Sequence, residues 1–111
     1  MNNELLHGTL EMLILKTLTW ESMHGFGIGR WIEQLGGDSL RIEEGSLYPA
    51  LYRLERKGWI ESEWGISEKN RRAKYYSLTP EGRRALKSGV TQWAGFADAI
   101  ARVLSAKKQP V

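Results

Sequence analysis

Apolar residues recur every three or four positions in the first part of the chain, which is the spacing of an amphipathic helix. The first stretch consists of Leu6, Leu10, Leu13, Ile14, Thr17 and Leu18. His24 and Gly25 interrupt this pattern, and a second helix is expected over residues 26–35, followed by a Gly-Gly-Asp turn. We therefore predict two helices before residue 40, the first about four turns long.

Proline locates the start of the third predicted helix. Pro49 lacks an N–H and fits best in a first turn, which places the N-cap near Ser46. The buried stripe is then formed by Leu47, Ala50, Leu51 and Leu54. The outer face carries Tyr48, Pro49, Tyr52, Arg53 and Arg56. Exposed aromatic residues beside arginines predict a surface that contacts a partner.

After Gly58 the pattern alternates, as in strands. One strand is expected over residues 59–64, with Ile60 and Trp64 on one face, and a second over residues 74–78. The loop between them is polar and carries Lys69, Arg71 and Arg72, with Lys74 beginning the second strand. The result is a β-ribbon whose cationic tip can reach phosphate or a minor groove.

The sequence Thr-Pro-Glu at positions 79–81 marks another helix start, with an N-cap, a proline and a first-turn acid. The apolar positions of this helix form a heptad seam of Leu86, Val90, Trp93, Ala97, Ile100 and Leu104. Phe96 and Val103 widen the seam. We expect it to pair with a second chain, with Leu6 and Leu10 adding to the contact; docking onto the first helix of the same chain is the alternative.

Composition indicates one globular domain, because the 111 residues are 41% hydrophobic and 26% charged. The net charge is only +3, but its distribution is uneven. Residues 1–40 contain two cationic and five acidic residues, whereas residues 69–87 contain seven cationic residues and one acidic residue. Such a run can be simply a solvated face, or it can mark a nucleic-acid contact.

The residue inventory argues against catalysis. There is no cysteine, hence no disulfide or thiolate metal site, and a reducing cytoplasm is the expected compartment. The short apolar run of residues 12–15 is neither a signal peptide nor a membrane span. His7 and His24 have no nearby partners of a catalytic triad, and no phosphate-binding glycine loop follows a strand. We predict no enzyme activity, cofactor or metal, and structural roles for both histidines.

Taken together, these motifs resemble the PadR-type transcriptional regulators, which are winged-helix dimers. The resemblance rests on His-Gly-Thr-Leu-Glu at 7–11, His-Gly-Phe at 24–26, Gly-Ser-Leu-Tyr-Pro-Ala-Leu at 45–51 and Lys-Tyr-Tyr at 74–76. It implies that the third helix enters the major groove, that the wing contacts the flanking backbone, and that Tyr48 and Lys74 take the family's DNA-contacting roles. The chain departs from the family in Gly-Phe-Gly at 25–27 and in its single C-terminal helix, and so is similar to the short subgroup.

The predicted fold is mainly α with a small antiparallel β-wing. Residues 1–82 are expected to form a winged helix-turn-helix domain, residues 83–106 a dimerisation helix and residues 107–111 a disordered tail. The predicted function is a homodimeric repressor that binds double-stranded DNA at an inverted-repeat operator. The candidate DNA-binding residues are Ser46, Tyr48, Pro49, Tyr52, Arg53, Lys69, Arg71, Arg72 and Lys74.

Two alternatives stay open. In the short subgroup an aromatic ligand can lie between the two C-terminal helices, which makes Trp93 and Phe96 candidate effector contacts; Trp93 is equally explained as dimer core. A winged helix can also serve protein contact, with Tyr48 and Tyr52 binding another chain. The wing favours DNA, because protein interfaces are depleted in lysine.

Overall fold

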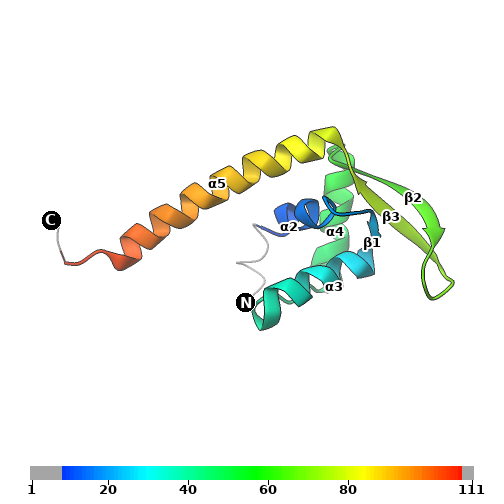
Figure 1. The fold of residues 1–111 in the computed structure, drawn as a ribbon, viewed down its shortest axis with the longest axis horizontal. Helices are drawn as coiled ribbons and strands as arrows, with labels where there is room; N and C mark the ends of the chain where they lie inside the picture. Colours follow the sequence, from blue (N-terminus) through cyan, green and yellow to red (C-terminus); the bar gives the residue numbers. More distant parts are fainter. Residues whose placement is uncertain (1–8, 109–111) are drawn as a thin grey trace.

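A computed structural model describes residues 9–108 of the chain. The elements are α2 (Leu10–Thr17), β1 (Met23–His24), α3 (Gly25–Gly36), the 3-10 helix η1 (Gly37–Ser39), α4 (Glu44–Arg56), β2 (Ile60–Ile66), β3 (Arg72–Leu78) and α5 (Pro80–Ser105). Helices α2, α3 and α4 form a head with the sheet at one end, and α5 projects away from it (Figure 1). The molecule therefore measures 61 × 29 × 21 Å.

The core lies where these three helices meet the base of the sheet. Its most deeply buried large side chains are Leu10, Ile14, Ile28, Leu51, Leu54 and Ile60. The buried stripe predicted for the third helix is confirmed, because Leu47, Ala50, Leu51 and Leu54 are all at most 3% exposed. Leu10 packs inside its own chain, which removes it from the outer surface where a dimer contact was expected. Leu6 lies outside the described residues.

The start of α4 corrects the predicted position of its N-cap. The N–H groups of Ser46 and Leu47 donate to the carbonyl of Glu43 at 3.0 and 2.9 Å, so the helix already begins at Glu44. Pro49 therefore lies inside the helix rather than in its first turn. The carbonyl four residues earlier belongs to Gly45, which is exposed, so water can satisfy what the missing N–H does not.

The first two helices also differ from the predicted pattern. Helix α2 ends at Thr17, well before His24, because the chain turns there to enter β1. Helix α3 is one residue longer at each end than expected. The ring of Phe26 and the side chain of Leu35 are 56% and 68% exposed, so these two apolar positions face outward and not toward the core.

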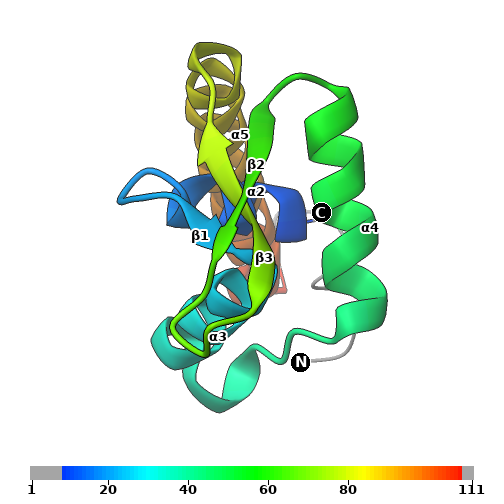
Figure 2. The same cartoon turned by 90° about the vertical axis from the view of Figure 1, so that its right-hand side faces the viewer.

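The sheet has three antiparallel strands in the order β1-β3-β2. Figure 2 shows β2 and β3 as a twisted pair beside α4. The two long strands pair from Ile60 opposite Leu78 to Ile66 opposite Arg72. They extend beyond the predicted strands and shorten the loop to residues 67–71. Strand β1 was not predicted, because two residues carry no readable alternation; it adds Met23 opposite Tyr76 on the free edge of β3.

Helix α5 follows the wing almost without a connection. The predicted cap is confirmed, because the Thr79 hydroxyl accepts the N–H of Gly82 at 3.0 Å and Pro80 begins the helix. The Thr79 hydroxyl also donates to the carbonyl of Gly58 at 2.7 Å. A Cβ atom on Gly82 would lie 2.0 Å from the Trp59 carbonyl oxygen, so only glycine fits this crossing. The helix start is thus fixed to the wing and to the end of α4.

Only the beginning of α5 packs on the head. Leu86 is buried, and Gly89 faces the side chain of Met12. Beyond this contact the seam is open, with Trp93 46% and Leu104 80% exposed. The alternative of docking onto the first helix therefore holds for the first turns of α5 alone. None of the helices described over residues 9–108 is long and apolar enough to cross a membrane.

Candidate nucleic-acid interface

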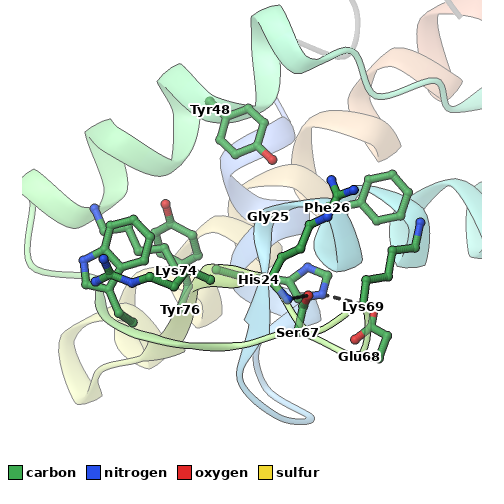
Figure 3. Close-up of a pocket in the computed structure, with 13 residues that line it drawn as sticks. His24, Gly25, Phe26, Tyr48, Ser67, Glu68, Lys69, Lys74 and Tyr76 are labelled. Carbon is green, nitrogen blue, oxygen red and sulfur yellow. Dashed lines mark hydrogen bonds and ion pairs between the residues drawn. The ribbon is translucent and has the colours of Figure 1, made fainter.

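A hollow of about 490 Å³ lies between α4, the wing and the start of α3 (Figure 3). Its aromatic lining consists of Phe26, Tyr48, Trp64 and Tyr76, and its cationic lining of Lys69, Arg71, Arg72 and Lys74. The structure thus brings the four predicted wing cations together with Tyr48 on one concave surface. Glu68 is the one acidic residue that lines this hollow.

Tyr48 stands between α4 and the start of α3, with its ring directed into the hollow (Figure 3). A Cβ atom on Gly25 would lie 2.7 Å from Cε1 and 3.0 Å from the hydroxyl oxygen of Tyr48, so the ring rests directly on the glycine backbone. Burial, together with the charge of Glu44, raises the pKa of the Tyr48 phenol. The hydroxyl consequently stays protonated at neutral pH and can donate a hydrogen bond to a phosphate or a base.

The face of α4 opposite the core carries Pro49, Tyr52 and Arg56, all of them exposed. The guanidinium of Arg56 lies 5.8 Å from the ring centroid of Tyr52, within the range of a cation–π contact. Ser46 is half-buried in the first turn of the same helix. This face therefore offers rings, a hydroxyl and one guanidinium to a partner.

Arg53 does not lie on that outer face. Its Nε donates to Oε2 of Glu11 at 2.8 Å, and the Nζ of Lys57 donates to Oε1 of the same carboxylate at 2.9 Å. Partial burial raises the pKa of Glu11, but the hydrogen bonds and charges of Arg53 and Lys57 together outweigh burial and hold this pKa below its ordinary value. Arg53 thus links α4 to α2. Its partner is 42 residues away in sequence, which no local pattern reveals.

Two cations of the wing tip, Lys69 and Arg72, lie over aromatic rings. The guanidinium of Arg72 lies 4.6 Å from the ring centroid of Trp64, and Nζ of Lys69 lies 6.0 Å from that of Phe26. Arg71 is exposed in the loop. Within residues 9–108 none of these three cations forms a salt bridge. Stacking directs the side chains without neutralising their charge, so the tip stays cationic.

Lys74 is placed differently. Its Nζ lies 3.4 Å from Oε1 of Glu55 on α4 and 5.9 Å from the ring centroid of Tyr76. The second oxygen of Glu55 accepts a hydrogen bond from the hydroxyl of Ser62 at 2.7 Å. Lys74 therefore faces the hollow while its charge is partly balanced by the carboxylate of Glu55 on α4. Glu55 was not predicted as a site residue from the sequence, because it belongs neither to the buried apolar stripe of α4 nor to its exposed aromatic and basic face.

His24 joins the wing to α3, which confirms its predicted structural role. Its Nδ1 accepts the N–H of Gly27 at 3.0 Å and caps α3, while Nε2 lies 3.4 Å from Oε1 of Glu68. The imidazole also meets the ring of Tyr75 edge-on, at 5.4 Å between centroids. The wing tip is thereby held against the start of α3, which fixes one wall of the hollow.

Comparison with known proteins agrees with this arrangement. The family model of the transcriptional regulator PadR-like family matches residues 14–88. The chain belongs to the PadR-like family. This PadR-like protein is similar to a transcriptional regulator from Clostridium thermocellum, at 30% identity and a TM-score of 0.82, over 90% of this chain and 97% of that one.

Two further relatives support the same assignment. A PadR family transcriptional regulator from Eggerthella lenta is 35% identical with a TM-score of 0.81, over 94% of this chain and 88% of that one. A transcriptional regulator of Mycobacterium tuberculosis is 41% identical over 59 residues, which are 52% of this chain and 54% of the relative. The predicted family and the winged-helix fold are confirmed, and the PadR-like chain is a transcriptional regulator, in a family of regulators and not of enzymes.

Proposed function

We propose that this PadR-like regulator is a repressor that binds an inverted-repeat operator as a homodimer. Helix α4 enters the major groove, and the wing follows the adjacent backbone. The observation that carries this proposal is the hollow between α4 and the wing, which is lined by aromatic rings and by four cations, three of them without a salt bridge among the described residues. A duplex supplies what such a surface lacks, namely a line of phosphates beside base edges.

The two sides of the hollow have separate tasks in this proposal. Lys69, Arg71 and Arg72 neutralise phosphates, because no salt bridge within the described residues engages them. On α4, Ser46, Tyr48, Pro49 and Tyr52 contact bases through hydroxyl groups and apolar surface. Arg53 would reach DNA only by leaving Glu11, so we assign it to holding α4 on the head and not to base contact.

The exposed seam of α5 supports the homodimer. Val90, Trp93 and Ile100 are between 41% and 48% exposed on a helix that projects from the head. With Ala97 and Leu104 they form the apolar face that a second copy would cover; Leu86 is already buried against the head. A two-fold dimer presents two recognition helices, so the operator needs two symmetric half-sites about 10 bp apart or a multiple of that distance.

An aromatic effector is a further part of the proposal. The rings of Trp93 and Phe96 are 6.3 Å apart between centroids and tilted by 50°. Across a dimer axis these rings and their counterparts would form a slot for a flat ligand. The ligand releases DNA only as far as it prefers one spacing of the two heads over another. If no aromatic compound changes Trp93 fluorescence or operator binding, Trp93 is dimer core.

Genomic fragments captured by the purified protein test the DNA-binding proposal. We expect enrichment of an inverted repeat, and tight binding of a labelled duplex that carries it. The affinity should fall steeply as salt is raised: for each phosphate contact, its logarithm should fall by about 0.9 for every tenfold increase in salt concentration. A reporter gene behind the operator should be silenced when the protein is present. Capture without any common repeat, with salt-independent binding, would instead support the protein-contact module.

A further inference from the structure

We propose that Glu55 restrains non-specific DNA binding by holding the ammonium group of Lys74 on the recognition helix. This inference rests on the proposed DNA-binding function and goes beyond it, because it gives an acidic residue a part in choosing between duplexes. Glu55 itself contacts no base. It is a positioning residue that acts through Lys74 and through the angle of the wing.

The geometry joins one carboxylate to both strands of the wing. Glu55 accepts from Ser62 on β2 at 2.7 Å and pairs with Lys74 on β3 at 3.4 Å. Within residues 9–108 these are the only polar side-chain contacts from α4 to the wing. The carboxylate thus fixes the relative orientation of α4, which would enter the major groove, and of the wing, which would follow the adjacent backbone.

The charges give the same carboxylate a second effect. Lys74 lines the hollow, and its side chain is 39% exposed against 33% for Glu55, so water screens the pair only in part. A phosphate that approaches Lys74 must either compete with Glu55 or accept a carboxylate nearby. This cost applies to every duplex, because all duplexes present the same phosphates.

Orientation, in contrast, matters only for the operator. A wing held at a fixed angle to α4 keeps the base contacts and the backbone contacts in register. Random DNA gains nothing from this register, because it lacks the matching bases. Glu55 thus lowers the affinity for random DNA and preserves the affinity for the operator. The result is a larger ratio of operator affinity to random-DNA affinity.

Two other carboxylates lack this arrangement. Glu11 pairs with Arg53 of α4 and with Lys57 just after it, on the side of α2, and neither of these cations lines the hollow, whereas Lys74 does. Glu63 is exposed in the middle of β2 and forms no salt bridge among the described residues. Glu63→Gln is therefore a matched control, with the same loss of charge beside Ser62 on β2 but without a paired cation within residues 9–108.

The test measures binding of the full-length dimer to operator and random duplexes over a range of salt. Glu55→Gln retains an acceptor for Ser62, and it should raise affinity for random DNA about threefold at low salt while the operator gains less. Glu63→Gln should change both duplexes by a smaller and equal factor. Ser62→Ala, which keeps the charge but frees the carboxylate, should reduce discrimination with little change of the salt slope.

Coupling between the pair gives the sharper result. Lys74→Met should change the salt slope little in the wild-type background, but by about 0.9 unit in the Glu55→Gln background, where Lys74 is free to bind phosphate. An equal loss of slope in both backgrounds overturns the inference, as does an unchanged ratio of affinities in Glu55→Gln.

Failure of the function and failure of the inference are distinguishable. A wild-type protein that binds neither duplex overturns the proposed function together with this inference, whereas normal wild-type binding with uncoupled variants overturns the inference alone. Thermal unfolding verifies that each variant is folded. If Glu55→Gln does not fold, Lys74→Met alone tests the inference. A loss of about one unit of salt slope would exclude that Glu55 holds Lys74 away from phosphate, and a small loss would support it.

Discussion

The head, residues 9–79, and the outer part of α5, residues 90–105, use the same apolar residue types in opposite ways. In the head, Ile14, Ile28 and Leu54 are completely buried. In the outer part of α5, Ile100 is 41% and Leu104 80% exposed, on a helix of equally regular geometry. Periodic apolar residues thus predict an amphipathic helix, but they do not show whether its apolar face is covered by the same chain.

The largest expected effect comes from truncating a leucine on each side of this comparison. Leu54→Ala should lower the free energy of unfolding by about 2–5 kcal/mol, because it leaves a cavity in a closed core. Leu104→Ala should leave the monomer nearly unchanged and weaken only self-association. Urea unfolding at two protein concentrations separates these effects. Equal losses of unfolding free energy for the two variants at low protein concentration would contradict this difference between the head and the outer part of α5.

A charge in the seam should separate the two copies and leave the head folded. Ile100→Asp would bury an unpaired carboxylate in the proposed dimer, so the dissociation constant should rise about a hundredfold or more. Sedimentation velocity reports the change of mass, and circular dichroism of the monomer reports the fold. Ile100→Leu is the control and should remain dimeric. A wild-type protein that sediments as a monomer at micromolar concentration removes the basis of this prediction.

Two glycines sharpen the comparison further. Gly25→Ala in the head would place Cβ 2.7 Å from the ring of Tyr48, so the ring must move and operator discrimination should fall by about 1–3 kcal/mol, as for one lost base contact. Gly95→Ala in the outer part of α5 meets no atom within 4 Å and should stabilise the helix by about 1 kcal/mol. Operator titrations and thermal melts of both variants provide the measurements. Unaltered discrimination in Gly25→Ala would show that Tyr48 reads no base.

The smallest expected effect is the acid sensitivity of the contact between α2 and α4. Because the folded-state pKa of Glu11 lies below its ordinary value, this carboxylate stabilises the head at neutral pH. That stability is retained above the ordinary pKa and is lost as the pH falls through the folded-state pKa. The loss should stay under about 1 kcal/mol, because Arg53 and Lys57 are partly solvated. Glu11→Gln should remove this part of the pH dependence in urea unfolding between pH 7 and pH 3.

Local chemistry explains which parts of the fold could be predicted from the sequence. The cap at Thr79 and the buried stripe of α4 depend on neighbouring residues, and both predictions are confirmed. The start of α4 was predicted wrongly, because the proline rule considers the missing N–H and not whether water reaches the orphaned carbonyl of Gly45. Strand β1 exists only because the edge of β3 is available, which is a tertiary fact.

The candidate site shows the same division. The residue types of the wing and α4 were readable from the sequence, and the structure gathers Tyr48, Lys69 and Arg71 around one hollow. The carboxylate partner of each cation could not be predicted from the sequence. Arg53 and Lys74 have similar sequence surroundings of basic and aromatic residues, yet each meets a different carboxylate through the fold. Whether each candidate residue contacts DNA stays a prediction.

The wing and the projecting helix α5 form one rigid unit, because the connection from β3 to α5 is very short. Only Thr79 separates Leu78 from Pro80, and its hydroxyl is bonded on both sides, so no loop is present to absorb a rotation. The helix is about 39 Å long at 1.5 Å per residue, so a turn of about 5° at its base moves its far end by about 3 Å. Conversely, in the proposed dimer a shift of a few ångströms between the two α5 helices would rotate both wings by several degrees.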